Sequence, residues 1–188
     1  LERLPGIHHD SSCIVVSGSD GTCIIDPGTT WYQSNLVERL KPHLDQRAPV
    51  TTILLTHRHF DTCAAAPYIA NQFGASIRIH EDAVAPLSGG DLFTTWASRY
   101  DSDMPIIDAL PLKDGDIISL GDVEIEVLNC PGPAVAVHLL EHRQHVPIRP
   151  IHRGVLWLGH WLDPVGEVPQ KAEHLAQPLS LIHISEPT

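Results

Sequence analysis

The sequence predicts an α/β domain in which mixed β-sheets carry helices on their outer faces. Three observations in chain order lead to this fold class. A hairpin opens the chain, with strands at 12–17 and 22–26 on either side of Asp20-Gly21. A β–α–β unit follows, from a buried strand at 51–56 to another strand at 76–80. Hairpins return after residue 109, one of them turning at Gly121-Asp122.

The remaining elements follow from periodicity and from breaker residues. A helix at 35–46 has apolar residues at helical spacing, although Pro42 lies inside it. The alanine-rich segment 62–73 ends at Gly74, which indicates a helix with a glycine stop. Further segments are predicted as helices at 91–100 and 171–177, and as strands at 110–112, 116–120, 123–128, 134–140 and 155–158.

Composition and charge narrow the class of partner. The 188 residues suit one domain, and 43% hydrophobic residues can form a real core. A formal net charge of -11 repels phosphate backbones, so we expect no nucleic acid partner. No apolar run approaches the roughly 18 residues of a membrane span, so we expect no membrane partner either.

The number and spacing of the cysteines bear on the cellular compartment of the protein. The four cysteines are Cys13, Cys23, Cys63 and Cys130, and no two of them form a C-x-x-C pair. We therefore expect buried, reduced residues rather than a structural zinc knuckle. Together with the lack of a signal peptide at the start of the sequence, this predicts a cytoplasmic protein. A leader that preceded Leu1 remains an open alternative.

The most informative segment is THRHFD at 56–61, which lies where a buried strand ends and a helix begins. Two imidazoles at positions i and i+2 on such a turn can converge on one ion, and Asp61 can serve a neighbouring ion or a bound water. Imidazole plus carboxylate suits zinc, with iron or manganese as alternatives. A catalytic zinc lowers the pKa of its bound water to about 7 and so supplies hydroxide at neutral pH. The sequence therefore predicts a metal site at His57, His59 and Asp61.

THRHFD resembles the T-H-x-H-x-D-H signature of the metallo-β-lactamase superfamily, and three further segments resemble the family's motifs in the same order. They are IIDPG at 24–28, DGDIISLGDVEIEVLNCPG at 114–132 and GVLWLGHWL at 154–162. The resemblance implies a four-layer αβ/βα sandwich with one or two metals at the sheet edge, here truncated at its C-terminal end. It also implies a hydrolase, most similar to the glyoxalase II-like and general hydrolase branches. Metal-bound hydroxide would then attack an ester, thioester, lactone or similar bond of a small molecule.

The resemblance also implies roles for individual residues. His57 and His59 match the two opening ligands of the first metal. Asp61 matches the aspartate of the second metal, and as the catalytic residue it would orient or deprotonate the water. Asp26 resembles a buried aspartate whose carboxylate orients a metal-bound histidine. A simple cap of its own turn is the alternative for Asp26.

The chain departs from the family's ligand set at three positions. Thr62 stands where the signature has another histidine, Pro133 replaces the histidine of C-P-G-H-T, and His160 replaces the bridging aspartate. A neutral imidazole offers one lone pair to one ion, so His160 favours a single-metal site. Pointing inward, it would complete a three-histidine site. The alternative is a histidine packed between two tryptophans with no metal.

Three explanations of these departures stay open: a naturally degenerate paralogue, sequencing errors, or a site rebuilt from other residues. We expect the hydrolase to be impaired as written, with weak binding of divalent metal, and whether it is an enzyme at all is left open. The rival hypothesis is a non-catalytic domain of the same fold that binds a ligand or partner without turnover. The substrate, the metal, the oligomeric state and the true termini are not readable from these residues.

Two further features concern the ends of the chain. The histidine pair His8-His9 is typical of an exposed pair, although in this family the segment before the first strand often borders the active site; His80 is expected to be structural. The last ten residues, LSLIHISEPT, resemble the translation of a sequencing adapter. We therefore divide the chain into a metallo-β-lactamase-like domain at 1–178, with an incomplete second half, and an adapter-derived tail at 179–188 that packs poorly.

Overall fold

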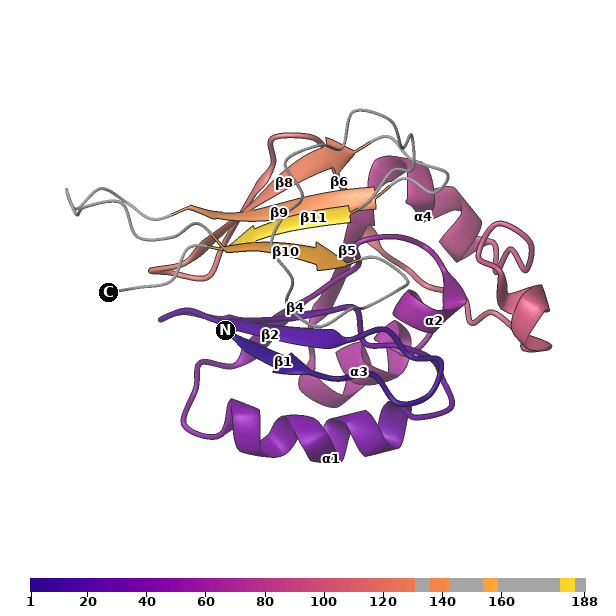
Figure 1. Cartoon of the computed structure of the whole chain (residues 1–188), viewed down its shortest axis with the longest axis horizontal. Helices are drawn as coiled ribbons and strands as arrows, with labels where there is room; N and C mark the ends of the chain where they lie inside the picture. The colour runs from indigo at the N-terminus through magenta and orange to yellow at the C-terminus, as the bar shows by residue number, and fades with distance from the viewer. Residues whose placement is uncertain (131–135, 143–153, 159–179, 185–188) are drawn as a thin grey trace.

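A computed structural model describes residues 1–130, 136–142, 154–158 and 180–184, and two β-sheets form its centre (Figure 1). The first sheet has the order β1-β2-β3-β4-β5-β6. Its strands are β1 (Glu2–Leu4), β2 (Cys13–Ser17), β3 (Thr22–Ile25), β4 (Val50–Leu54), β5 (Ser76–His80) and β6 (Leu110–Leu112).

The strand directions in the first sheet create one edge suited to a site. The pairs β1–β2 and β2–β3 are antiparallel, whereas β3–β4, β4–β5 and β5–β6 are parallel. The carboxyl ends of β3 to β6 therefore meet at one edge of the sheet. Ligands of open α/β sheets bind at such edges.

Both faces of the first sheet are buried, as the strand β2 illustrates. Cys13 and Val15 belong to the core on the helical side, whereas Ile14 and Val16 belong to the core shared with the second sheet. This alternation follows from the period of two in a strand. It explains why these strands read as continuous apolar runs instead of alternating apolar and polar residues.

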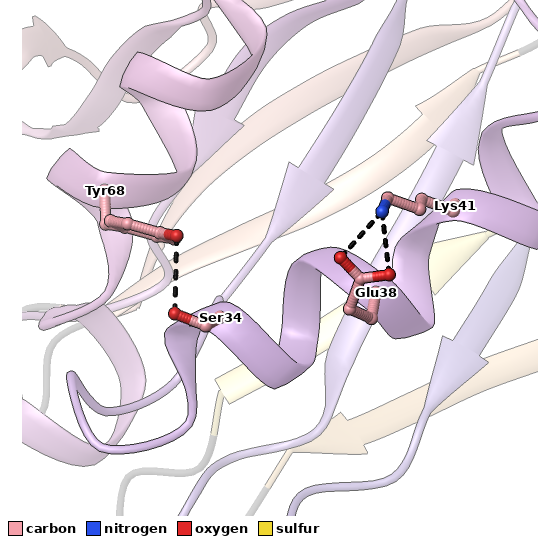
Figure 2. A network of polar contacts seen from close by, with 4 residues as sticks. All are labelled: Ser34, Glu38, Lys41 and Tyr68. Carbon is pink, nitrogen blue, oxygen red and sulfur yellow. Dashed lines mark hydrogen bonds and ion pairs between the residues drawn. The ribbon is translucent and has the colours of Figure 1, made fainter.

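Two helices, α1 (Gln33–Leu44) and α3 (Ala66–Phe73), cover one face of the first sheet. Their buried faces include Leu36, Leu40 and Ile69. Ser34 of α1 donates a hydrogen bond to the Tyr68 hydroxyl of α3 at 3.3 Å, and the exposed side of α1 carries an ion pair between Glu38 and Lys41 (Figure 2). Among the residues that the structure describes, no helix is long and apolar enough to cross a membrane.

The second sheet packs on the opposite face and has the order β10-β11-β9-β8-β7. Its strands are β7 (Ile117–Ser119), β8 (Glu124–Cys130), β9 (Ala136–His142), β10 (Gly154–Leu158) and β11 (Ser180–Ile184). The described residues thus form three layers: helices, first sheet and second sheet. This arrangement confirms the α/β class. The predicted helix at 171–177 lies outside the described residues.

The segment after β5 differs from the prediction. A helix, α4 (Glu81–Ser88), starts directly at the end of the strand, and the predicted helix at 91–100 is instead a loop that ends in a short 3-10 helix, η1 (Ala97–Tyr100). The Asp91 carboxylate accepts hydrogen bonds from the backbone N–H groups of Phe93 and Thr94. Such local bonds to the backbone favour a turn over a helix, so the prediction of a helix at 91–100 was wrong.

The alanine-rich segment is helical but divided. It forms α2 (Phe60–Cys63) and then α3, which has Pro67 in its first turn and ends at Gly74 with φ 69°. Proline has no N–H to continue the hydrogen bonds of a preceding helix, so the break falls just before it. The positive φ of Gly74 agrees with the predicted glycine stop.

The end of the chain contributes to the second sheet. Strand β11 pairs antiparallel with β10 and parallel with β9. The backbone of 180–184 is therefore part of a sheet, although the sequence analysis set this segment apart as a poorly packed tail. The division of the chain at residue 178 and the adapter origin of the tail stay predictions.

Candidate metal centre

The predicted metal motif lies at the carboxyl-terminal edge of the first sheet. Strand β4 ends at Leu54, and His59 is the N-cap residue of α2, with an extended ψ of 146°. His59 and Asp61 are buried, and His57 is half-buried. The strand-to-helix turn thus brings together the three residues that the sequence predicted.

The three side chains present their donor atoms to a common point. One potential ligand atom from each of His57, His59 and Asp61 lies within 4.8 Å of the others. The two imidazole rings are nearly perpendicular, with an interplanar angle of 89° and centroids 4.7 Å apart. Two imidazoles and one carboxylate make a donor set that zinc accepts, so these residues fit one ion with a further position open.

A chain of hydrogen bonds connects Asp26 to the motif. The Asp26 carboxylate accepts from the Thr56 backbone N–H at 2.9 Å and from the Thr56 hydroxyl at 2.7 Å. The same hydroxyl lies 3.0 Å from Nδ1 of His57. When Asp26 is ionised, the hydroxyl donates its one proton to Asp26 and its oxygen accepts from His57, which favours the tautomer with the proton on Nδ1 and the lone pair on Nε2. Asp26 thus reaches His57 through Thr56, a residue that was not predicted from the sequence.

Burial governs the charge of Asp26. Desolvation raises the pKa of this fully buried carboxyl from 3.8 to about 7, although the hydrogen bonds from Thr56 oppose the rise. Asp26 also adopts a left-handed backbone conformation, with φ 54°, directly after β3. These contacts place Asp26 where it could orient His57 through Thr56, and the orienting role of Asp26 stays a prediction.

Thr62 occupies the position where the family signature has another histidine. The residue is buried, and its hydroxyl lies 3.2 Å from Nε2 of His57. With the imidazole proton on Nδ1, this hydroxyl donates to the Nε2 lone pair. A metal ion at the same lone pair would have to displace that hydrogen bond. Thr62 therefore offers no imidazole nitrogen to a metal, and its hydroxyl competes with the metal for Nε2 of His57.

An aromatic cluster lies beside Asp61. It is built from His9, Trp31, Phe60 and Tyr100, whose ring centroids lie 5.4 to 6.3 Å apart in the contacting pairs. Tyr100 forms a hydrogen bond with the carboxylate of Asp61; desolvation first, and then the charge of Asp61, raises the pKa of the tyrosine. The exposed His8-His9 segment therefore does reach the border of the site.

Asp10 completes this border and was also missed from the sequence. Its carboxylate accepts a hydrogen bond from the Thr29 N–H at 2.9 Å, and the neighbouring Ser11 N–H donates to the Asp61 carbonyl oxygen at 2.9 Å. Burial raises the pKa of Asp10. The sequence offered no signal for Asp10 or Tyr100, because only tertiary contacts bring them to the motif.

Other predicted residues divide into two groups. His80 is buried and its Nδ1 accepts a hydrogen bond from the Asp82 N–H at 3.4 Å, which agrees with the expected structural role. Cys13, Cys23 and Cys63 are buried free thiols, also as expected. Pro133 and His160 lie outside the described residues, so the role of His160 as a metal ligand stays a prediction.

Solved structures similar to this chain include subclass B3 metallo-β-lactamases. The enzyme BJP-1 of Bradyrhizobium japonicum is 20% identical with a TM-score of 0.59, and the match covers 69% of this chain and 55% of that one. The di-zinc enzyme LRA-12 from an Alaskan soil metagenome is 22% identical with a TM-score of 0.61, with 74% and 53% covered. This chain therefore spans about half the length of these structures, and the likeness concerns the fold.

A family comparison covers most of the chain. No curated protein matches this chain. The model of the metallo-beta-lactamase superfamily matches residues 7–146, which include the hairpin of β2 and β3, the metal motif and the loop that follows α4. On this evidence the chain belongs to the metallo-beta-lactamase superfamily.

Proposed function

We propose that this protein is a metal-dependent hydrolase whose ion is held by His57, His59 and Asp61. The observation that carries the proposal is the convergence of their three donor atoms within 4.8 Å at the edge of a parallel sheet. The donor set suits zinc, with iron or manganese as alternatives. The chain's membership of the superfamily supports zinc, and so does its similarity to LRA-12, which is a di-zinc enzyme.

Each residue has a separate task in this proposal. His57 holds the ion through Nε2, because its Nδ1 proton is directed to Thr56. His59 holds it through one ring nitrogen, and Asp61 orients the attacking water or accepts its proton. When bound by these residues, a metal of this kind would supply a water with a pKa of about 7 as the nucleophile at neutral pH.

The substrate class follows from the family and from charge. We propose a small molecule with an ester, thioester, lactone or similar carbonyl bond. The net charge of -11 supports a small molecule over a nucleic acid. A β-lactam belongs in the same test panel, because the similar structures are named β-lactamases. The buried free thiols of Cys13, Cys23 and Cys63 support a reducing, cytoplasmic setting.

A second candidate function is a non-catalytic domain of the same fold. The contact between Thr62 and Nε2 of His57 favours it, since a hydroxyl lies where the signature has another imidazole. On this reading the protein binds a ligand or partner without turnover. The same contact supports an intermediate outcome: an enzyme that binds one ion weakly and turns over slowly.

Metal titration together with a substrate panel separates these possibilities. The zinc-free protein is titrated with zinc by calorimetry, and hydrolysis of ester, thioester, lactone and β-lactam probes is followed with and without chelator. We expect one zinc bound at about micromolar affinity and slow, chelator-sensitive hydrolysis that Asp61→Asn abolishes. Metal binding without any turnover would support the non-catalytic domain. A protein that neither binds metal nor hydrolyses any probe would refute the hydrolase proposal.

A further inference from the structure

The loop between α4 and η1 contacts three consecutive residues of the metal motif. Nε of Arg58 donates to the Thr94 carbonyl oxygen at 3.3 Å, and the Phe60 N–H donates to the Thr95 carbonyl oxygen at 2.7 Å. Between these two bonds, the imidazole of His59 stacks on the indole of Trp96. The centroids are 4.0 Å apart and the planes differ by 13°.

This loop is fixed by its own polar contacts. Asp91 accepts hydrogen bonds from the N–H groups of Phe93 and Thr94 and from the Thr94 hydroxyl, at 2.8, 3.2 and 2.8 Å. The side chain of Thr95 is fully buried and its hydroxyl donates to the Asp91 carbonyl oxygen. The loop therefore presents Trp96 on a defined frame.

Trp96 has a backbone conformation that its side chain disfavours. Its φ of 62° lies in the left-handed region, where the Cβ of an L-residue comes too close to the backbone carbonyl oxygen. Strain of this kind persists where the surrounding structure over-determines it, and it concentrates at functional sites. The conformation aims the indole at His59.

A cation covers the other face of the indole. The guanidinium carbon of Arg99 lies 4.1 Å from the centroid of the Trp96 ring. His59 already occupies one face at 4.0 Å, so Arg99 must lie on the opposite face. The indole is thus held between an imidazole and a guanidinium, in an order that we name the Arg99–Trp96–His59 stack.

We propose that Trp96 is a positioning residue of the metal centre, which fixes the ring plane of His59. This inference rests on the proposed function, in which His59 holds the ion. An imidazole must direct a lone pair at the metal, and rotation of its ring about the Cβ–Cγ bond moves that lone pair away. The parallel indole opposes such rotation, as outer-sphere partners of metal-bound histidines do.

The variant Trp96→Gly tests the proposal without straining the backbone. Glycine adopts a positive φ readily, so this change removes the ring and relieves the strain at once. Trp96→Phe keeps a stacking partner, and Phe93→Gly is the matched control, because Phe93 belongs to the same loop with its side chain 81% exposed. The measurements are zinc affinity by competition with a chromophoric chelator and the visible absorption of the cobalt-loaded protein.

We expect Trp96→Gly to weaken zinc binding about 10- to 100-fold and to shift the cobalt absorption bands. Trp96→Phe should recover most of the affinity, and Phe93→Gly should match the parent. Equal affinity and spectra for Trp96→Gly and the parent would overturn the proposal. So would a Trp96→Phe variant that binds as weakly as Trp96→Gly, because an aromatic ring stacked on His59 would then not be what sustains zinc affinity.

A metal-free measurement keeps this inference separate from the proposed function. If the parent binds no zinc or cobalt, the hydrolase proposal fails, and NMR of the His59 ring protons decides the positioning role. The ring current of the stacked indole should shift these resonances in the parent and in Phe93→Gly, and Trp96→Gly should remove the shift. Resonances of His59 that stay unchanged in Trp96→Gly would refute the stack.

Discussion

The metal motif is held from two sides that differ in kind. On the strand side, Asp26 follows directly on β3 and Thr56 lies two residues beyond β4; both are buried and reach His57 through hydrogen bonds. On the loop side, an irregular segment reaches His59 through the stacked ring of Trp96. The parallel sheet determines the positions of the residues on the strand side, whereas tertiary contacts determine those of the residues on the loop side. We therefore expect the strand side to govern stability and the loop side to govern metal geometry.

The largest expected effect is a difference in the free energy of unfolding between variants of two phenylalanines, Phe60 and Phe93. Phe60 is fully buried beside the motif, whereas Phe93 is 81% exposed on the loop. Phe60→Ala should lower the free energy of unfolding by about 3–5 kcal/mol, because it leaves a cavity in a packed core. Phe93→Ala should change it by less than about 0.5 kcal/mol. Urea denaturation followed by circular dichroism measures both, and comparable losses would break the proposed contrast.

The second prediction uses the raised pKa of Asp26. A carboxyl whose pKa is about 7 in the folded protein and 3.8 in the unfolded chain binds more protons when folded. Its contribution to stability is therefore complete below about pH 4 and is lost as the pH rises toward 7. Asp26→Asn should remove this decline. Denaturation at several pH values, with chelator present, gives the free energy of unfolding as a function of pH for the parent and for Asp26→Asn. If stability falls with pH equally in both proteins, Asp26 does not titrate in this way.

A third prediction removes the link between Asp26 and His57. Thr56→Val keeps the shape of the side chain but leaves the buried carboxylate without its hydroxyl donor. We expect a loss of about 1–3 kcal/mol in the free energy of unfolding and a decrease in zinc affinity of about 10-fold or more. Thr51→Val, an exposed change in the preceding strand β4, is the control. If both variants bind zinc alike, Thr56 does not orient the imidazole.

The smallest effect is expected at Thr62, and its sign is the informative part. Thr62→Val removes the hydroxyl that donates to Nε2 of His57 and keeps the volume of the side chain. A net hydrogen bond contributes about 0.5–1.5 kcal/mol, so zinc affinity should rise about twofold to tenfold. Competition with a chromophoric chelator measures the change. Weaker binding in Thr62→Val would mean that the hydroxyl assists the metal instead of competing with it.

The two sides of the motif differ in how much of their structure could be predicted from the sequence. The motif at His57, His59 and Asp61 lies at the predicted strand-to-helix turn, because a short apolar run followed by polar residues and an alanine-rich segment is a local signal. The loop was predicted as a helix and is not one. Its conformation depends on the Asp91 carboxylate and on bonds to Arg58 and Phe60, none of which shows in a propensity or a period.

The sequence by itself determined the α/β class, the superfamily and the three residues of the motif, since these follow from local order along the chain. Only the tertiary structure decided what surrounds them: the hydroxyl of Thr56 between Asp26 and His57, the hydroxyl of Thr62 at Nε2, and Trp96 stacked on His59. The physical reason is range. A strand, a turn and a helix stop depend on neighbours in the chain, whereas the contacts that orient the two rings form only when folding brings distant residues together: Asp26 to Thr56, beside His57, and Trp96 to His59.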